Sequence, residues 1–279
     1  MLAMMVIGSV AFTSCSKDDD DDDNKTSNPI VGVWSSGTYD YAKARSISPK
    51  KTVGNANLKK AETTIVYEEL IEYFSTKGVL TDIYINYDAD MNVVGYIFET
   101  SKYVVEDNKL TLYYGEEKYE YTFEVVDKQL QLTEIGESDT YVYEYKGKNV
   151  PSSYFNEFKK LLCGYAWMDK EIYYDDEENT REIAFVVFNT NGTLYQYECE
   201  FDNTTNKLIE SSCDEAKWSL KDFVINVKDG PETAEVYGFI QNDYMGTYVF
   251  DGFKAEEETF FDAMSLDDPE ILDIINNTK

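Results

Sequence analysis

Acidic and amide side chains near residue 90 have the spacing of calcium ligands. Asp88, Asp90 and Asn92 occupy alternate positions, and Glu99 follows Asp88 by eleven residues. An EF-hand loop supplies its oxygen ligands at this spacing. However, Val93 replaces the glycine that the sharp turn of such a loop requires. The flanking residues also alternate between apolar and polar, which is typical of strands, so we expect a polar hairpin tip and no metal site.

A basic segment interrupts a strongly acidic chain. The sequence has 54 Asp and Glu against 25 Lys and Arg, a net charge of −29, yet no acid occurs between Tyr41 and Ala61. Such a reversal suits an anionic glycan, a carboxylated ligand or the acidic tail of the protein itself. Turn-forming residues in the same interval equally indicate a long loop without a ligand. The candidate anion-binding residues are Lys43, Arg45, Lys50 and Lys51.

Three cysteines lie in the second half of the chain, at Cys163, Cys199 and Cys213. Cys199 and Cys213 flank the turn-forming sequence DNTTNK, and a disulfide bond between them would stabilise the fold by about 3 kcal/mol. Buried free thiols are the alternative, because one of the three would remain without a partner. None of these cysteines has the spacing of a zinc site.

The chain contains no histidine. This removes the usual general base and the nucleophile systems that depend on it. Pairs of carboxylates are unavoidable among so many acids, but nothing selects one pair. We therefore expect a protein that is not an enzyme and has no cofactor. The negative charge would repel a phosphate backbone, so we expect no nucleic-acid partner.

The N-terminus has the features of an export signal. The apolar run Leu2–Phe12 is too short to span a bilayer, which takes about 20 residues. Small residues and Cys15 follow it, as at the cleavage site of a lipoprotein signal. Six aspartates, Asp18 to Asp23, come next, and they would remain solvated in an extended tether.

The series Cys-Ser-Lys followed by aspartates resembles the lipoproteins of Bacteroidetes that are exported to the cell surface. The resemblance covers about the first 24 residues. It implies a signal peptide over residues 1–14 and an acidic tether over residues 15–29. It also implies lipidation at Cys15, so that the membrane is a partner through an acyl anchor on the outer membrane.

Alternation of apolar and polar residues dominates the remaining chain. In Leu194–Phe201 the aromatic residues and Cys199 share one face, and Gln196, Glu198 and Glu200 share the other. Many such short segments separated by turn clusters predict an all-β sandwich or barrel. Helices are expected at Pro151–Leu162, with Ser152 or Ser153 as the cap, and after Asp268-Pro269-Glu270.

The part of the chain that follows residue 29 contains an internal repeat. Phe74, Gly78 and Leu80 match Phe188, Gly192 and Leu194 at identical offsets, and three further matches follow the same order. We interpret this as a tandem duplication with domains at 30–150 and 151–279. The two glycines are expected in hairpin turns, which require positive φ.

These repeated motifs resemble the lipocalin-like domains of bacterial lipoproteins. The shared features are the Gly-x-Trp opening, the Phe-x-x-x-Gly-x-Leu hairpin and the Tyr-rich final strand. The resemblance implies two tandem small antiparallel β-barrels, each with a short helix at its end, and a base plugged by Trp34 and Trp167. We expect ligand contacts from Trp34, Tyr103, Trp218, Tyr195 and Tyr197.

The expected function is therefore binding. A surface-anchored lipoprotein would bind a small apolar ligand, a glycan or a surface protein at aromatic-lined barrel mouths. The alternative is a structural or adhesive subunit built from β-sandwich domains. Pairing of the first and last strands of each repeat favours binding, and open sheets with a detachable strand favour assembly.

Overall fold

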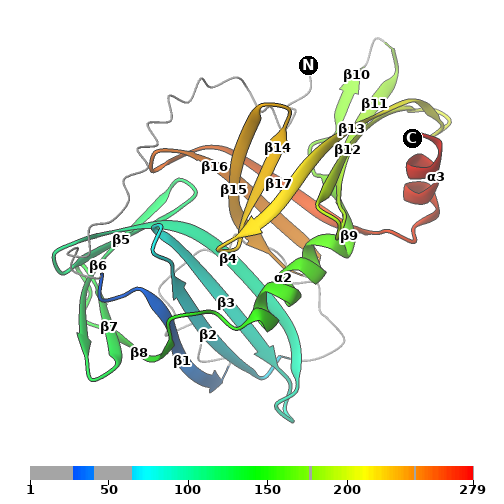
Figure 1. Ribbon diagram of the computed structural model, residues 1–279. Helices are drawn as coiled ribbons and strands as arrows, with labels where there is room; N and C mark the ends of the chain where they lie inside the picture. The colour runs from blue at the N-terminus through cyan, green and yellow to red at the C-terminus, as the bar shows by residue number, and fades with distance from the viewer. Residues whose placement is uncertain (1–27, 41–64, 176–177, 242, 279) are drawn as a thin grey trace.

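The fold is described from a computed structural model, which covers residues 28–40, 65–175, 178–241 and 243–278. Within these residues the protein is all-β with two short helices (Figure 1). Cys15, the aspartate run and the basic residues Lys43, Arg45, Lys50 and Lys51 lie outside the described residues. No helix in the described ranges is both long enough and apolar enough to cross a membrane.

The first eight strands form a closed antiparallel barrel, called the N-terminal barrel below. Each strand pairs with the next, and β8 pairs back with β1 through Trp34 opposite Tyr145. The strands are β1 (Gly32–Asp40), β2 (Tyr67–Phe74), β3 (Val79–Tyr87), β4 (Val93–Glu106), β5 (Lys109–Tyr114), β6 (Glu117–Val126), β7 (Gln129–Glu134) and β8 (Thr140–Gly147). The predicted β-barrel architecture is confirmed for this half of the chain.

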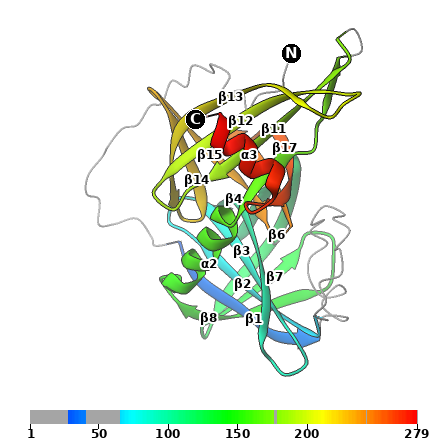
Figure 2. The same cartoon turned by 90° about the vertical axis from the view of Figure 1, so that its right-hand side faces the viewer.

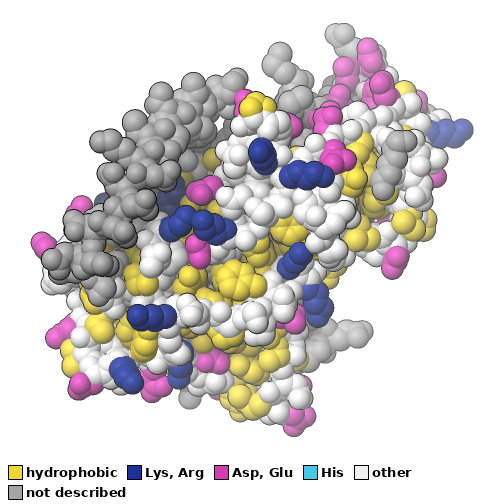
Figure 3. All heavy atoms as spheres, in the orientation of Figure 1, with side chains coloured by type: hydrophobic (Ala, Val, Ile, Leu, Met, Phe, Trp, Pro, Cys, Tyr) yellow, Lys and Arg dark blue, Asp and Glu magenta, His cyan; other side chains and the backbone are white. Residues whose placement is uncertain are grey.

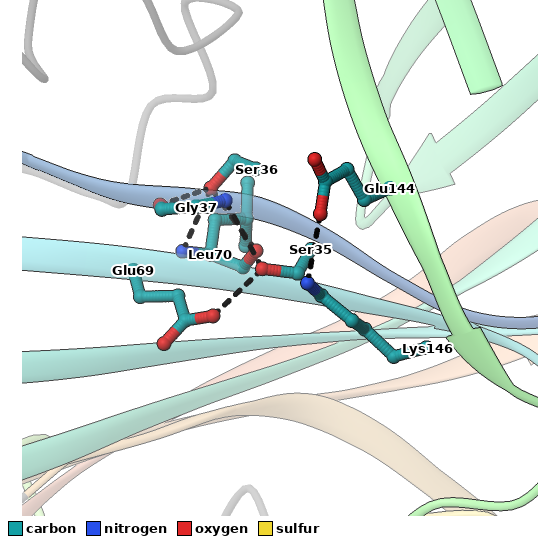
Figure 4. Close-up of polar contacts among 7 residues, drawn as sticks. All are labelled: Ser35, Ser36, Gly37, Glu69, Leu70, Glu144 and Lys146. Carbon is teal, nitrogen blue, oxygen red and sulfur yellow. Dashed lines mark hydrogen bonds and ion pairs between the residues drawn. The ribbon is translucent and has the colours of Figure 1, made fainter. Parts of the chain in front are cut away.

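At a β-bulge in β1, a serine side chain replaces backbone hydrogen bonds between β1 and β2. The register between β1 and β2 shifts between Ser35 and Thr38. The Ser36 hydroxyl accepts a hydrogen bond from the Leu70 N–H and donates one to the Leu70 carbonyl, both at 3.1 Å (Figure 4). Gly37 follows with a φ of +75°. The bulge therefore leaves both backbone groups of Leu70 satisfied.

The C-terminal strands form a second cycle of pairings, called the C-terminal ring below. β9 and β11 to β17 pair in succession, and β17 pairs back with β9, while β10 extends β11 in a short hairpin. The strands are β9 (Tyr165–Asp169), β10 (Tyr173–Asp175), β11 (Thr180–Phe188), β12 (Thr193–Asp202), β13 (Leu208–Lys221), β14 (Val224–Asp229), β15 (Glu232–Ile240), β16 (Tyr244–Asp251) and β17 (Lys254–Ser265).

Both predicted helices are confirmed. α2 (Ser152–Cys163) begins after Pro151, which occupies the N-cap position without a side-chain cap, so the expected serine cap is wrong. α3 (Pro269–Asn277) begins as predicted, with the Asp268 carboxylate accepting hydrogen bonds from the N–H groups of Glu270 and Ile271. Ile271 and Ile274 of α3 are buried against β11 and β12.

A continuous apolar seam joins the N-terminal barrel to the C-terminal ring. α2 lies between them in both ribbon views (Figures 1 and 2). Phe98 of β4 stacks on Phe223 with ring centroids 5.7 Å apart, and Phe158 of α2 meets Phe98 edge-on. β4 also pairs with β15, with Thr100 opposite Gly238. Hydrophobic side chains accordingly gather across the middle of the face shown in Figure 3.

The repeated motifs have matching geometry. Phe74 meets Tyr103 edge-on at 5.1 Å, and Phe188 meets Trp218 edge-on at 5.5 Å. The Tyr103 hydroxyl donates to the Ser75 carbonyl, and the Trp218 indole N–H donates to a carbonyl at the corresponding place in the second turn. Residues that match in the sequence thus make equivalent contacts in the two halves.

The two turn glycines are confirmed in the positive-φ region, at +76° for Gly78 and +85° for Gly192. The carbonyl of Gly78 accepts a hydrogen bond from the Tyr103 N–H at 2.8 Å, and that of Gly192 accepts one from the Trp218 N–H at 2.9 Å. A Cβ atom at either glycine would lie 3.1 Å from the carbonyl oxygen of that same aromatic residue. Both the backbone conformation and the close approach therefore require glycine.

Candidate functional site

Strands β2 and β3 each carry an acidic side chain that points into the N-terminal barrel. In β2, Glu72 lies between Leu70 and Phe74, which belong to the apolar cluster inside the barrel. Side chains two residues apart share a face of a strand, so Glu72 also points inward. In β3, Asp82 follows the interior residue Leu80 by two positions and points inward for the same reason.

These acids form a row across three neighbouring strands. Glu72 of β2 lies directly opposite Asp82 of β3, and Asp82 lies directly opposite Glu99 of β4. Their exposed fractions are 1%, 0% and 8%. Directly opposite residues have Cβ atoms only about 5 Å apart, and like charges in that arrangement destabilise a sheet. We call Glu72, Asp82 and Glu99 the carboxylate row.

Tyrosine hydroxyls surround the carboxylate row. Tyr114 donates a hydrogen bond to Asp82 Oδ2 at 2.6 Å, and Tyr143 hydrogen-bonds Glu72. Burial, followed by the negative charges of the carboxylates, raises the pKa of both phenols well above 10.0. Their hydroxyls therefore stay protonated and act as hydrogen-bond donors to the row.

Tyr84 lies in the middle of the acidic groups. Burial raises its pKa well above the usual value, and the charges of Asp82, Glu99, Glu68 and Glu72 raise it further, in that order. Glu68 is thus a fourth carboxylate close to this ring, and it is itself only 7% exposed. The inside of the barrel thus combines several carboxyl groups with aromatic faces.

Two neutral polar side chains complete the lining. Asn86 pairs across the strands with Glu68, and Ser101 pairs with the interior residue Leu80. Asn86 is 5% exposed and Ser101 is fully buried. Among the groups that the structure describes, none forms a hydrogen bond with Asn86 Oδ1 or Ser101 Oγ. Buried polar atoms normally have a partner, so Asn86 Oδ1 and Ser101 Oγ are exceptions among the described groups.

The two ends of the N-terminal barrel differ in polarity. The end that carries the turns after β2, β4 and β6 is filled with apolar and aromatic side chains, among them Trp34, Phe74 and Leu110. Glu68 and Asn86 lie toward the opposite end, where β3 turns back into β4. The polar lining therefore extends from the middle of the barrel toward one end only.

Trp34 and Tyr103, both predicted ligand residues, lie at the apolar end. Trp34 is 2% exposed and its indole N–H donates to the Ile30 carbonyl at 2.7 Å. Tyr103 packs against Phe74 and is likewise buried. Their polar atoms are used within the fold, and the structure does not bring them to the carboxylate row.

The remaining predicted ligand residues belong to the C-terminal ring. Trp218 lies on the inner apolar face beside Phe188. Tyr195 and Tyr197 lie on the opposite face of the sheet, where they pack in the cluster beneath α3. The two tyrosines face a core, as their alternation indicates, but α3 rather than the inside of the ring provides that core. The structure therefore does not bring the five predicted residues together.

The other predicted sites have structural explanations. Asp88 Oδ1 accepts hydrogen bonds from the N–H groups of Asp90 and Asn92, which caps the tip of the β3–β4 hairpin as expected. The described residues contain no cluster of three His, Cys, Asp or Glu placed to hold a metal ion. Cys199 and Cys213 form no disulfide bond in the structure. They are diagonal neighbours, because Tyr197 is directly opposite Cys213.

The carboxylate row was not singled out from the sequence, although a signal for it exists. Acids that alternate with apolar residues generally predict the solvent-facing side of a strand. In YEELIEYF, however, Glu72 shares its face with Phe74, and the repeat marks Phe74 as an inward residue. Combining the repeat with the alternation would have placed Glu72 inside the barrel.

The inner face of the C-terminal ring repeats part of this pattern. Glu182 precedes Phe188 by six residues, as Glu68 precedes Phe74, and Asp214 corresponds to Glu99 in the same way. Burial raises the pKa of Glu198 on this face, and the charges of Asp214 and Glu182 raise it further. Glu198 is only half-buried, so this second acidic group is more open to solvent than the carboxylate row.

Comparison with known proteins does not assign the chain to a family. No protein-family model, no curated protein and no solved structure matches this chain. The functional argument therefore depends on the barrel interior itself.

Proposed function

We propose that the protein binds a small ligand inside the N-terminal barrel and has no enzymatic activity. The observation that supports this best is the polar lining of a closed barrel. A purely structural core would be filled by apolar side chains, because burying carboxylates and an amide costs desolvation energy. Ligand sites, in contrast, combine apolar and aromatic walls with a few placed polar groups.

The proposal includes a second lipocalin-like barrel formed by the C-terminal ring. The complete cycle of strand pairings supports it, as do the equivalent contacts of Phe74 and Phe188. The domains would be 30–150 and 151–279, as the repeat predicts. Two tandem barrels are the arrangement that the resemblance to lipocalin-like lipoproteins implies.

We also propose that the protein is a lipoprotein on the surface of the outer membrane. Support comes from the sequence alone, through the apolar run before Cys15 and the aspartates after it. Metabolic labelling with a palmitate analogue should label the protein and should fail to label Cys15→Ser. Protease treatment of intact cells should then remove the labelled protein from the surface.

Closure of the N-terminal barrel favours binding over the structural alternative. β1 pairs with both β2 and β8, so its hydrogen-bonding edges are both occupied. A subunit that assembles by strand exchange needs an open edge or a detachable strand. The barrel offers neither at this position.

Native mass spectrometry of protein purified from its own membrane tests the proposal. We expect a bound small molecule in the wild type and a reduced bound fraction in Asp82→Asn. Glu124→Gln is the matched control, because Glu124 is an exposed acid on the outer face of β6. Wild-type protein without any bound molecule in repeated preparations, and no stabilisation by a broad library of small molecules, would contradict the proposal.

A further inference from the structure

We infer that Tyr248 of the C-terminal ring closes the wall of the N-terminal barrel beside the ligand site and so controls how fast a ligand enters and leaves. The inference rests on the proposed function, because it concerns access to the same site. Tyr248 would act as a positioning residue, since its hydroxyl bonds the barrel wall and not the ligand.

The hydrogen-bonded ladder between β4 and β5 ends before it reaches the carboxylate row. β4 pairs with β5 only over residues 102–106, whereas its pairing with β3 on the other side continues past Glu99 to Val93. Among the described strands, β15 of the C-terminal ring borders β4 beyond this ladder, with Thr100 opposite Gly238. The wall of the barrel beside Glu99 is therefore completed by the C-terminal ring.

A tyrosine hydroxyl occupies the next position of the β4–β5 ladder. The last pair of this ladder is Lys102 opposite Tyr113. Hydrogen-bonded pairs of an antiparallel ladder recur every two residues, so Thr100 opposite Gly115 would be the next. The Tyr248 hydroxyl donates to the Thr100 carbonyl, and the backbone N–H of Gly115 donates to the same hydroxyl. Tyr248 thus satisfies two backbone groups that would otherwise bond each other or water.

Contacts from both units hold Tyr248 in this place. Its side chain is 5% exposed and meets Phe250 edge-on, with ring centroids 5.2 Å apart. Val79 of the N-terminal barrel belongs to the same apolar cluster. Lys102 adds a second link between the units, because its Nζ donates to the Gly252 carbonyl at 2.8 Å. The position of the hydroxyl therefore depends on the docking of the C-terminal ring.

The inserted hydroxyl lies next to the proposed site. Both chain neighbours of Thr100 point into the barrel, because Glu99 is opposite Asp82 and Ser101 is opposite the interior residue Leu80. Burial raises the pKa of Tyr248 well above its usual value, and the charges of Glu99 and Asp82 raise it further. The hydroxyl therefore stays protonated and donates to the wall.

Separation of β4 from β5 at Thr100 would give a direct route to the carboxylate row. The apolar end of the barrel is filled by side chains, among them the fully buried Phe74 and Leu110. A residue that only closes a route changes the rates of entry and release by the same factor. The dissociation constant stays unchanged, because the contacts of the bound ligand are the same.

Stopped-flow fluorescence with the neutral probe N-phenyl-1-naphthylamine tests the inference. Tyr248→Phe removes the hydroxyl and keeps the ring. We expect both rate constants to rise roughly fivefold, with a dissociation constant within about twofold of the wild type. Tyr237→Phe is the matched control, because Tyr237 lies in the same cluster but its hydroxyl bonds Glu235 of its own strand. Its rates should equal those of the wild type.

Hydrogen exchange tests the inserted hydroxyl without any ligand. We expect the Gly115 amide to exchange roughly tenfold faster in Tyr248→Phe and at the wild-type rate in Tyr237→Phe. Circular dichroism establishes that each variant is folded. If Tyr248→Phe does not fold, Lys102→Met replaces it, since it removes the link to Gly252 and should also raise both rates. Unchanged rates in the folded variant, or weaker binding with an unchanged association rate, would overturn the inference.

The two proposals fail in distinguishable ways. Binding inside the barrel is recognised by a probe signal that Asp82→Asn lowers and Glu124→Gln leaves unchanged. If the probe does not bind there, native mass spectrometry follows the release of the co-purified molecule, with the same difference expected between the variants. A ligand that exchanges at the wild-type rate in Tyr248→Phe would overturn only the role of Tyr248. A wild type that binds neither the probe nor a co-purifying molecule would contradict both proposals.

Discussion

At the scale of single residues, the N-terminal barrel combines groups that rarely occur together in a core. Asp82 is fully buried, yet it accepts a hydrogen bond from Tyr114 and lies directly opposite two further acids. The hydrogen bond from the Tyr114 hydroxyl to Asp82 is 2.6 Å long and buried. This tyrosine thus holds the Asp82 carboxyl group in place inside the barrel.

Removal of the Tyr114 hydroxyl tests this role. Tyr114→Phe leaves a buried acceptor on Asp82 with one donor fewer, so we expect the free energy of unfolding to fall by roughly 1.5–3 kcal/mol. Denaturant titration followed by fluorescence measures the change. Tyr119→Phe is the control, because its hydroxyl bonds the exposed Glu117 and the expected loss is below about 1 kcal/mol. Equal losses in the two variants would argue against a special role for the buried pair.

Tyrosine burial also predicts sensitivity to alkaline pH. Burial, the charge of Asp222 and a hydrogen bond to it raise the pKa of Tyr73 to about 12. In the unfolded chain the phenol titrates near pH 10. Its protonated form therefore stabilises the fold fully below about pH 10, and this contribution is lost as the pH rises to about 12.

Denaturation curves between pH 9 and about 12 measure the effect. We expect Tyr73→Phe to lose less stability over this interval than the wild type. Tyr174→Phe, at an exposed position, should behave like the wild type. A Tyr73→Phe variant with the unchanged slope would mean that this phenol does not contribute to the alkaline transition.

At the scale of elements, the local signals in the sequence were reliable. Alternation predicts the strands, and Asp268-Pro269-Glu270 predicts the start of α3, because caps, turns and strand faces depend on neighbouring residues. The side of a strand that faces the barrel interior depends on distant partners. Tyr197 faces α3, which lies about 70 residues further along the chain, and alternation alone cannot distinguish the two cores.

The repeated hairpins offer a test at the same scale. Gly78→Ala and Gly192→Ala would each place a Cβ in a positive-φ position 3.1 Å from a carbonyl oxygen. We expect similar losses of stability in both, each of about 1–3 kcal/mol, because the surroundings are equivalent. Gly230→Ala is informative as a control, since its Cβ would meet open space and only the backbone cost would remain. Strongly unequal losses at Gly78 and Gly192 would contradict the equivalence of the two turns.

At the scale of the whole molecule, the N-terminal barrel and the C-terminal ring share one apolar cluster. The apolar seam joins β4, α2 and the β13–β14 turn, and it is continuous with the inner face of the C-terminal ring. Thr100 and Gly238 also exchange hydrogen bonds across the junction, at 2.9 and 3.1 Å. We therefore expect the wild type to unfold in one cooperative transition.

Phe223 is the residue through which this coupling can be tested. It is 1% exposed and stacks on Phe98 and Phe155. We expect Phe223→Ala to lose about 3–5 kcal/mol and to separate unfolding into two transitions in differential scanning calorimetry. Phe253→Ala, at a position that is 49% exposed, should remain cooperative and lose much less. A single transition with a small loss in Phe223→Ala would show that the seam does not couple the units.

The central claim is that the tyrosine-lined interior of the N-terminal barrel binds a small ligand. The most direct measurement is a crystal structure of the protein purified from its own membrane. The account predicts electron density for a bound small molecule inside the barrel, in contact with Tyr84 and Asn86. An interior that holds protein side chains alone in such crystals would contradict the account.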